Sequence, residues 1–271
     1  MKLDGRVAVV TGAGSGMGRE TALLFAEEGA HVVALDVRAE AAARTAAEAG
    51  GMSLGCDVSD RAQVDAAFAE VDERFGRVDV LANIAGINPS PGDATDRLYE
   101  GMLARIEQMH AGEKPTAPTD QLIHMSDEGW HRMIDVHLHG TFYCTRAALR
   151  IMTRSAIAGS IVNTASIAAL AGISQSHYCA AKAGILGFSR GLAREVAPRN
   201  IRVNVVCPGV IDTPMNTDIP PAIMAGLDVA IPLGRQGTAR EVAAVYLFLA
   251  CDDSSYITGQ WISPNGGLVI A

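Results

Sequence analysis

The sequence predicts a single α/β domain, in which a doubly wound parallel sheet lies between two layers of helices. Apolar runs of strand length alternate with longer stretches of helical period along most of the 271 residues, a pattern typical of βαβ units. Hydrophobic residues make up 49% of the chain and charged residues 19%, so a large core can be buried on both faces of the sheet. Right-handed crossovers would place bound ligands beyond the carboxyl ends of the strands.

Five apolar runs have the length of strands: Val7–Val10, His31–Leu35, Val78–Ala82, Ser160–Asn163 and Ile201–Val206. Five longer stretches have the period of helices: Gly18–Glu28, Arg61–Phe75, Glu128–Met152, Tyr178–Ala197 and Ala239–Ala250. Because strands and helices alternate along the whole chain, we expect one sheet and one domain over residues 1–271.

Two segments interrupt this alternation. Residues 87–127 show no strand pattern, and their best helical stretch is Leu98–His110. They hold too few apolar residues for a core of their own, so we expect an insertion near the mouth of the site. It either packs against the body or a neighbouring subunit, or caps the substrate pocket. Residues 208–237 are rich in proline and glycine, and we expect a substrate-binding lid there.

Charge and cysteine content exclude several classes of protein. The formal charge is −8 and no basic run occurs, which argues against nucleic acid or an anionic membrane as partner. We find no signal peptide before Val7 and no apolar stretch of membrane-spanning length. The five cysteines are scattered, as in reduced cytoplasmic proteins. The histidines at 110, 124 and 131 are not spaced as metal ligands, so no metal site is expected.

A glycine-rich turn follows the first strand at Thr11–Gly18. Glycine lets a backbone turn tightly and approach a pyrophosphate, and a helix N-terminus offers free N–H groups and a positive dipole end. Strand, turn and helix in this order indicate a Rossmann-like dinucleotide site. The candidate contacts are Gly12, Ser15, Gly16, Met17 and Gly18.

Asp36 ends the second predicted strand, eighteen residues after Gly18. A carboxylate there accepts hydrogen bonds from ribose hydroxyls and repels a 2′-phosphate. At about 4 Å and an effective dielectric near 20, two unit charges repel by roughly 4 kcal/mol. We therefore expect NAD in preference to NADP, with Arg38 as the one nearby cation that could reach a phosphate.

Tyr178 and Lys182 are four residues apart, which puts them on one face of a helix. Lowering a phenol pKa from near 10 to about 7 takes roughly 4 kcal/mol, which a lysine and a cationic nicotinamide could supply together. Ser166, twelve residues before the tyrosine, follows a strand and is suited to hold a substrate oxygen.

Taken together, these motifs resemble the compact single-domain branch of the short-chain dehydrogenase/reductase family. The resemblance covers nearly all of the chain apart from the insertion. Further matching segments are the adenine-pocket pair Asp57 and Val58, the run Asn83–Gly86 with Asn83, Ala85 and Gly86, and the run Pro208–Thr213 with Pro208, Gly209, Ile211 and Thr213.

The resemblance implies the roles of these residues. Tyr178 would be the general acid/base, and Lys182 would lower its pKa and hold the nicotinamide ribose. Ser166 would polarise the substrate oxygen; Ser174 is an alternative, because the spacing from Ser166 to Tyr178 is about one residue short for the family. Tetramers are common in this family, so a homo-oligomer is expected.

His137 departs from the family pattern, in which an asparagine at this place supports a water that relays protons to the lysine. Three interpretations remain open. The histidine serves the relay through its own ring nitrogen, it slows turnover, or it marks a chain that binds NAD without chemistry. A histidine can also carry a proton itself near neutral pH.

Three functions follow. The first is an NAD-dependent oxidoreductase that interconverts a secondary alcohol and a ketone. The second is a 3-oxoacyl-thioester reductase, since Ile231–Arg235 and the C-terminal block resemble the 3-oxoacyl-ACP reductases; that subgroup would want NADPH and basic residues near the pocket. The third is a catalytically silent NAD-binding sensor or scaffold. Aliphatic residues in the irregular segments, such as Ile173, Met215 and Leu227, favour a fairly apolar small-molecule substrate.

Overall fold

The computed structural model describes residues 1–270, which fold around a seven-stranded parallel sheet. The strands of this sheet are β1 (Val7–Thr11), β2 (His31–Asp36), β3 (Met52–Gly55), β4 (Val80–Asn83), β5 (Ser160–Thr164), β6 (Arg202–Val206) and β9 (Trp261–Ile262). Their spatial order is β3-β2-β1-β4-β5-β6-β9, so the order reverses between β1 and β4. Ligands bind at such a reversal in open α/β sheets.

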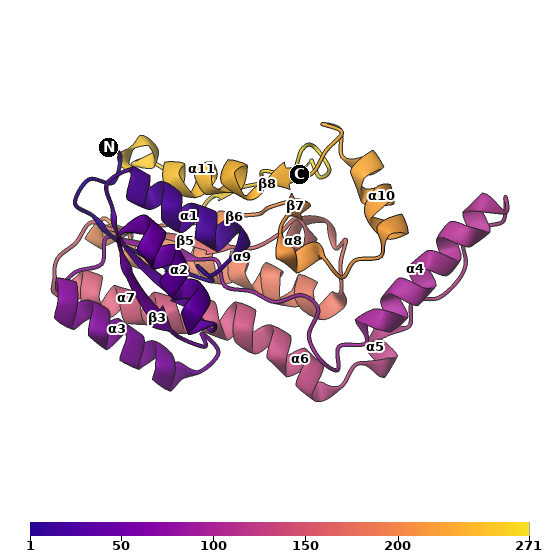
Figure 1. Ribbon diagram of the computed structural model, residues 1–271, viewed down its shortest axis with the longest axis horizontal. Helices are drawn as coiled ribbons and strands as arrows, with labels where there is room; N and C mark the ends of the chain where they lie inside the picture. The colour runs from indigo at the N-terminus through magenta and orange to yellow at the C-terminus, as the bar shows by residue number, and fades with distance from the viewer. Residues whose placement is uncertain (271) are drawn as a thin grey trace.

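Helices cover both faces of the sheet (Figure 1). The helices are α1 (Gly16–Glu27), α2 (Ala39–Ala49), α3 (Arg61–Phe75), α4 (Thr95–His110), α5 (Gln121–His124), α6 (Asp127–Ile134), α7 (Gly140–Arg154), α8 (Ala168–Ala171), α9 (Ser176–Val196), α10 (Pro221–Ala230) and α11 (Ala239–Ala250). One apolar layer holds side chains of α1, α2 and α11, and the other holds side chains of α3, α7 and α9. This confirms the predicted three-layer, doubly wound α/β fold.

Burial of the central strands explains why apolar runs in the sequence predicted them. Every residue of β1, β4 and β5 is buried, because helices cover both sides of each strand. A strand buried on both faces is a continuous apolar run and not an alternating one. At about 25 cal/mol per Å² of apolar surface removed from water, these layers are the main source of the fold's stability.

Two sequence-based elements need correction. The predicted strand at Val78 begins at Val80, because the Asp79 carboxylate accepts a hydrogen bond from the Val7 N–H at 2.8 Å and so closes the end of the sheet. The predicted helix Glu128–Met152 is interrupted by a π-helical segment, Asp135–His139, between α6 and α7. Such segments are frequent at functional sites.

Some elements were not predicted. The pair α2 and β3 and the edge strand β9 are short or weakly apolar, with mostly half-buried residues in β3 and β9. In the insertion, α4 projects away from the body, with α5 at its base (Figure 1). At the two ends of the segment 208–237, β7 (Ile211–Asp212) pairs with β8 (Gly237–Thr238), and α10 lies between these strands in the sequence. No helix among residues 1–270 is long and apolar enough to cross a bilayer.

Candidate active site

Two adjoining cavities lie at the carboxyl ends of the strands. The first has a volume of about 300 Å³ and the second about 160 Å³. They share the wall formed by Met17, Ile84, Gly86, Thr213 and Met215. The first is therefore placed to hold one part of a long ligand while the second holds another.

The glycine-rich turn forms the floor of the first cavity. Gly12 has φ +67°, and a Cβ there would lie 2.8 Å from the Ala85 Cα; both facts require glycine. A Cβ on Gly18 would lie 2.1 Å from the Gly12 carbonyl oxygen. Ser15 precedes α1 and makes no side-chain cap, so the first N–H groups of the helix are open to an anion.

Asp36 is buried beside this turn. One carboxylate oxygen accepts from the Gly14 N–H at 2.9 Å, and the other accepts from the Arg38 N–H at 2.9 Å. The Arg38 guanidinium approaches Asp36 at 3.4 Å and donates to the Ser15 hydroxyl at 2.9 Å. The carboxylate is therefore held rigidly and still has lone pairs for a ligand hydroxyl.

Asp57 and Val58 line the far end of the first cavity. Burial works to raise the pKa of Asp57, but hydrogen bonds from Ser59 and the charge of Arg132 outweigh it and lower that pKa. The Arg132 guanidinium lies 3.3 Å from the carboxylate and also lines the cavity. Sequence reasoning missed Arg132, because it lies 75 residues away in α6.

Asn83 lies apart from both cavity walls. Its amide nitrogen donates to the Thr145 hydroxyl at 3.0 Å and to the Asn163 side-chain oxygen Oδ1 at 2.8 Å. It therefore joins β4 to β5 and α7 beneath the site. Its neighbours Ala85 and Gly86 do line the first cavity, as do the five turn residues Gly12 and Ser15–Gly18.

The second cavity brings together Ser166, Tyr178 and Lys182. The Lys182 ammonium lies 5.5 Å from the centre of the Tyr178 ring and donates to the Thr164 carbonyl at 2.9 Å. Pro208, Gly209, Ile211 and Thr213 form another wall. The spacing of the tyrosine and lysine on α9 thus puts them on one helical face, as expected.

Burial sets the proton affinities of these two groups. It raises the pKa of Tyr178 to about 12, although a hydrogen bond with Ser166 acts in the opposite direction. It lowers the pKa of Lys182 to about 7. The chain's own groups therefore leave the phenol protonated at neutral pH, and the lowering to about 7 that we expected needs a further positive charge beside the phenol.

Of the two candidate serines, Ser166 is the one whose side chain acts to lower the pKa of Tyr178. The Ser166 hydroxyl also accepts from the Ala168 N–H at 3.1 Å. The Ser174 hydroxyl donates to the Gln175 side-chain oxygen at 2.5 Å. The small helix α8 lies between Ser166 and Tyr178 in the chain.

His137 lies in the wall of the second cavity, within the π-helical segment. Its ring packs edge-on against Tyr178 with centres 5.3 Å apart, and its Nε2 lies 2.9 Å from the Ile87 carbonyl oxygen. A Cβ on Gly86 would lie 2.5 Å from the ring, so glycine makes room for it. Burial lowers the pKa of His137 well below its usual range, so the ring is neutral at neutral pH.

Among residues 1–270, His137 Nδ1 is buried with no hydrogen-bond partner. A buried polar nitrogen without a partner is costly, and a water or ligand atom commonly satisfies it. The same residues hold no cluster of three or more His, Cys, Asp or Glu side chains suited to a metal ion.

These features define an α/β nucleotide-binding protein with an acid/base cluster beside the nucleotide cavity. A family model described as short chain dehydrogenase matches residues 6–223, and the chain belongs to the short-chain dehydrogenase/reductase family. It is therefore an oxidoreductase of a family that binds nicotinamide cofactors.

Curated relatives match over the full length. The chain is 40% identical to a 3-oxoacyl-[acyl-carrier-protein] reductase of Thermotoga maritima, with all of both chains covered. It is 38% identical to the (2S)-[(R)-hydroxy(phenyl)methyl]succinyl-CoA dehydrogenase subunit BbsD of Thauera aromatica, with 98% of each covered. A solved short-chain type dehydrogenase/reductase from Mycobacterium marinum superposes with a TM-score of 0.83 at 30% identity, covering 100% of this chain and 98% of that one.

Proposed function

We propose that this protein interconverts a secondary alcohol and a ketone, with NAD as the hydride acceptor or donor. The single observation that carries this proposal is the convergence of Tyr178, Lys182 and Ser166 in one small cavity that adjoins the glycine-rich turn. Residues 208–237 act as its lid, and the insertion stands at its mouth. The same convergence argues against a silent sensor or scaffold.

The first cavity fits a dinucleotide. Gly12 allows close backbone approach, the start of α1 offers free N–H groups, and Asp36 presents a carboxylate at the end of β2. Thr213, from the Pro208–Thr213 segment, lines both cavities, which suits a group that passes from one to the other.

The chain's own residues handle the proton. When bound, the nicotinamide supplies or accepts the hydride at the substrate carbon. Tyr178 takes the proton from the alcohol oxygen or returns it to the carbonyl oxygen. Ser166 donates a hydrogen bond to the same oxygen, and Lys182, whose pKa is lowered to about 7, provides positive charge near the phenol when it is protonated. A positioned acid/base of this kind is worth about 10²–10⁴-fold in rate.

The cofactor preference rests on Asp36. Its buried carboxylate disfavours a 2′-phosphate, while Arg38, which is largely exposed beside it, can turn toward one. We propose that NAD is preferred, with residual use of NADP through Arg38.

A 3-oxoacyl-thioester reductase is the second candidate, favoured by the name of the Thermotoga maritima relative. Its substrate also carries a ketone, so the same proton chemistry applies. The two candidates differ in whether the ketone must belong to an acyl thioester.

The test is turnover by the purified protein with NAD or NADP and a panel of secondary alcohols, ketones and 3-oxoacyl thioesters, followed at the absorbance of the reduced nicotinamide. We expect Tyr178→Phe to lower kcat by at least about 100-fold while NAD still binds in calorimetry. Full activity in this variant, or no turnover of any compound by the native protein, would end the proposal.

A further inference from the structure

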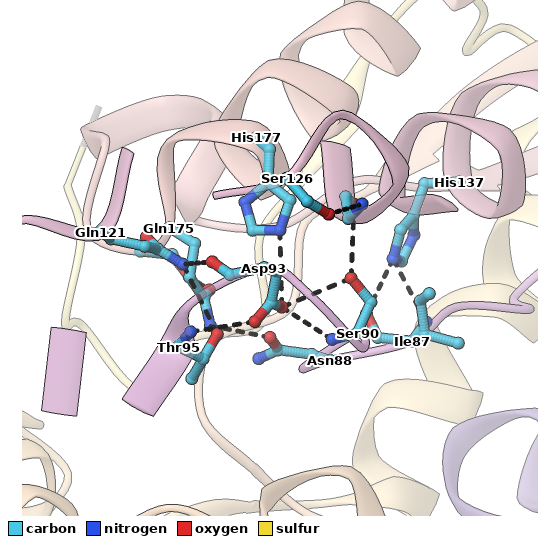
Figure 2. A network of polar contacts seen from close by, with 12 residues as sticks. Ile87, Asn88, Ser90, Asp93, Thr95, Gln121, Ser126, His137, Gln175 and His177 are labelled. Atoms are coloured by element: carbon cyan, nitrogen blue, oxygen red, sulfur yellow. Dashed lines mark hydrogen bonds and ion pairs between the residues drawn. The ribbon is translucent and has the colours of Figure 1, made fainter. Parts of the chain in front are cut away.

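The root of the insertion is joined to the start of the catalytic helix by a buried polar network (Figure 2). The Asp93 carboxylate, 3% exposed, accepts from the Ser90 N–H at 2.7 Å and the Thr95 N–H at 2.9 Å. His177, fully buried beside Tyr178, points its Nε2 at the same carboxylate at 3.5 Å. The network therefore fixes the backbone of residues 88–95 relative to α9.

Asn88 is the member of this network that reaches the substrate cavity. The Gln175 side chain, 3% exposed, donates from Nε2 to the Asn88 Oδ1 at 2.8 Å. Gln175 is itself held, because its oxygen accepts from the Ser174 hydroxyl at 2.5 Å. The Asn88 oxygen is thus engaged by the protein, and Asn88 lines the cavity together with Ser166 and Tyr178.

The other half of the Asn88 amide is free. Among residues 1–270, Asn88 Nδ2 donates to no protein acceptor, whereas the other polar side chains of the cavity wall outside the catalytic set are engaged. Asn216 donates to the Ile211 carbonyl at 2.7 Å, and Thr164 contacts the Asn83 carbonyl. His137 contacts the Ile87 carbonyl through Nε2, and its Nδ1, which has no partner among residues 1–270, is then an acceptor and not a donor. The rest of the wall is largely aliphatic, including Ile173, Ile219 and Leu227.

A single oriented donor in such a wall is a device for recognising one acceptor atom of a ligand. We propose that Asn88 is a specificity-determining residue whose Nδ2 donates to a second oxygen of the substrate, apart from the reacting one. The preferred substrates are then oxo or hydroxy compounds that carry a second carbonyl-type oxygen, rather than simple apolar alcohols. This inference rests on the proposed function and deepens it.

The network supplies the positioning. Gln175 holds the Asn88 amide before a ligand arrives, and Asp93 holds the backbone at Ser90 and Thr95. Little ordering is therefore required on binding, and the discrimination between substrates is correspondingly greater. A ketone without a second oxygen offers no acceptor to Asn88 Nδ2, so its binding gains nothing from this donor.

The test compares two ketones of equal chain length with the native enzyme and its cofactor: a 3-oxo ester and a plain methyl ketone. Asn88→Asp keeps the acceptor for Gln175 but replaces the donor by a carboxylate. We expect kcat/KM for the 3-oxo ester to fall by about tenfold or more, mainly through KM, because a neutral hydrogen bond is lost and two acceptors face each other. The plain ketone should change by less than about twofold.

A second variant guards against misfolding. Gln175→Met removes the donor that orients Asn88. We expect a smaller loss of kcat/KM than in Asn88→Asp, confined to the 3-oxo ester. The melting temperature of each variant is measured in parallel. Equal losses for both ketones, or no loss for either in Asn88→Asp, would overturn the role of Asn88 and leave the proposed function standing. If neither ketone is turned over by the native enzyme, the proposed function and this inference both fail.

Discussion

At the scale of single residues, burial decides the chemistry of the site. Lys182 is 2% exposed, and its ammonium has one carbonyl acceptor. Desolvation disfavours a charged group in such a place, so its pKa falls to about 7 from a usual 10.5. The lysine is therefore poised to gain or lose charge near neutral pH.

This shift makes a prediction for stability. Between pH 7 and about 10 the unfolded chain carries a proton on this lysine that the folded chain lacks, so the free energy of unfolding rises with pH. We expect the free energy of unfolding to rise with pH more steeply in the native protein than in Lys182→Met, by up to about 1.4 kcal/mol per pH unit. Urea unfolding at pH 7, 8 and 9 measures it, with Lys114→Met, which is exposed, as control. Parallel slopes in the native protein and Lys182→Met would contradict the shift.

His137 makes a separate prediction. Because burial lowers its pKa well below neutrality, it can serve a proton relay only as a neutral ring that binds water through Nδ1. We expect His137→Asn to shift the pH dependence of kcat/KM, measured from pH 5 to 10, without loss of NAD binding. An unchanged pH profile would count against a relay role.

At the scale of elements, the insertion is held by its root and not by its helix. In α4 only Thr95 and Gly101 are buried, and the helix projects from the body (Figure 1). Asp93 fixes the root, and hydrogen bonds to Ser90 and Thr95 together with His177 lower its pKa to about 2 against the opposing effect of burial. The charged carboxylate is thus part of the fold.

We expect Asp93→Ala to lower the free energy of unfolding by about 2–4 kcal/mol, since two buried N–H groups lose their acceptor. It should also raise KM for substrates of the proposed reaction, because the backbone that follows Asn88 loses the acceptor of its Ser90 and Thr95 N–H groups. Chemical unfolding and steady-state kinetics measure both effects. Asp96→Ala, at an exposed position on the same helix, is the matched control and should change stability by less than about 0.5 kcal/mol. Equal stability in the two variants would refute the anchoring role.

At the scale of the whole molecule, the outer surface of α7 and α9 carries an apolar groove. Its apolar lining is Phe142, Leu149, Phe188 and Leu192, and charged side chains border it: Arg146, Arg150, Arg154 and Glu195. The Arg146 guanidinium is stacked 4.7 Å above the Phe142 ring. Phe142 is 38% exposed. We propose that a second copy of the chain covers this groove, since an exposed apolar patch on a long helix pair marks an interaction site.

We therefore expect the native protein to be a homo-oligomer in light scattering after size exclusion. Phe142→Glu should shift it toward the monomer, because a charge would be buried in the contact. Tyr256→Glu, on a fully exposed side chain elsewhere, should leave the mass unchanged. A native monomer, or an unchanged mass in Phe142→Glu, would refute this interface.

The fold and much of the candidate site were predictable from sequence, because their signals are local. The apolar run of β1 reflects burial on both faces, the glycines of the turn are required by φ angles and close contacts, and the Tyr178–Lys182 spacing is about one helical turn. Each of these depends on residues a few positions apart.

Packing alone decided the rest. Asn83 binds side chains 62 and 80 residues away instead of lining a cavity, Arg132 reaches Asp57 from α6, and Gln175 orients Asn88 across 87 residues. The pKa values of Tyr178, Lys182 and His137 follow from the exclusion of water by the surrounding elements. Distances between remote residues and the depth of burial are properties of the assembled layers, and no local pattern in the chain carries them.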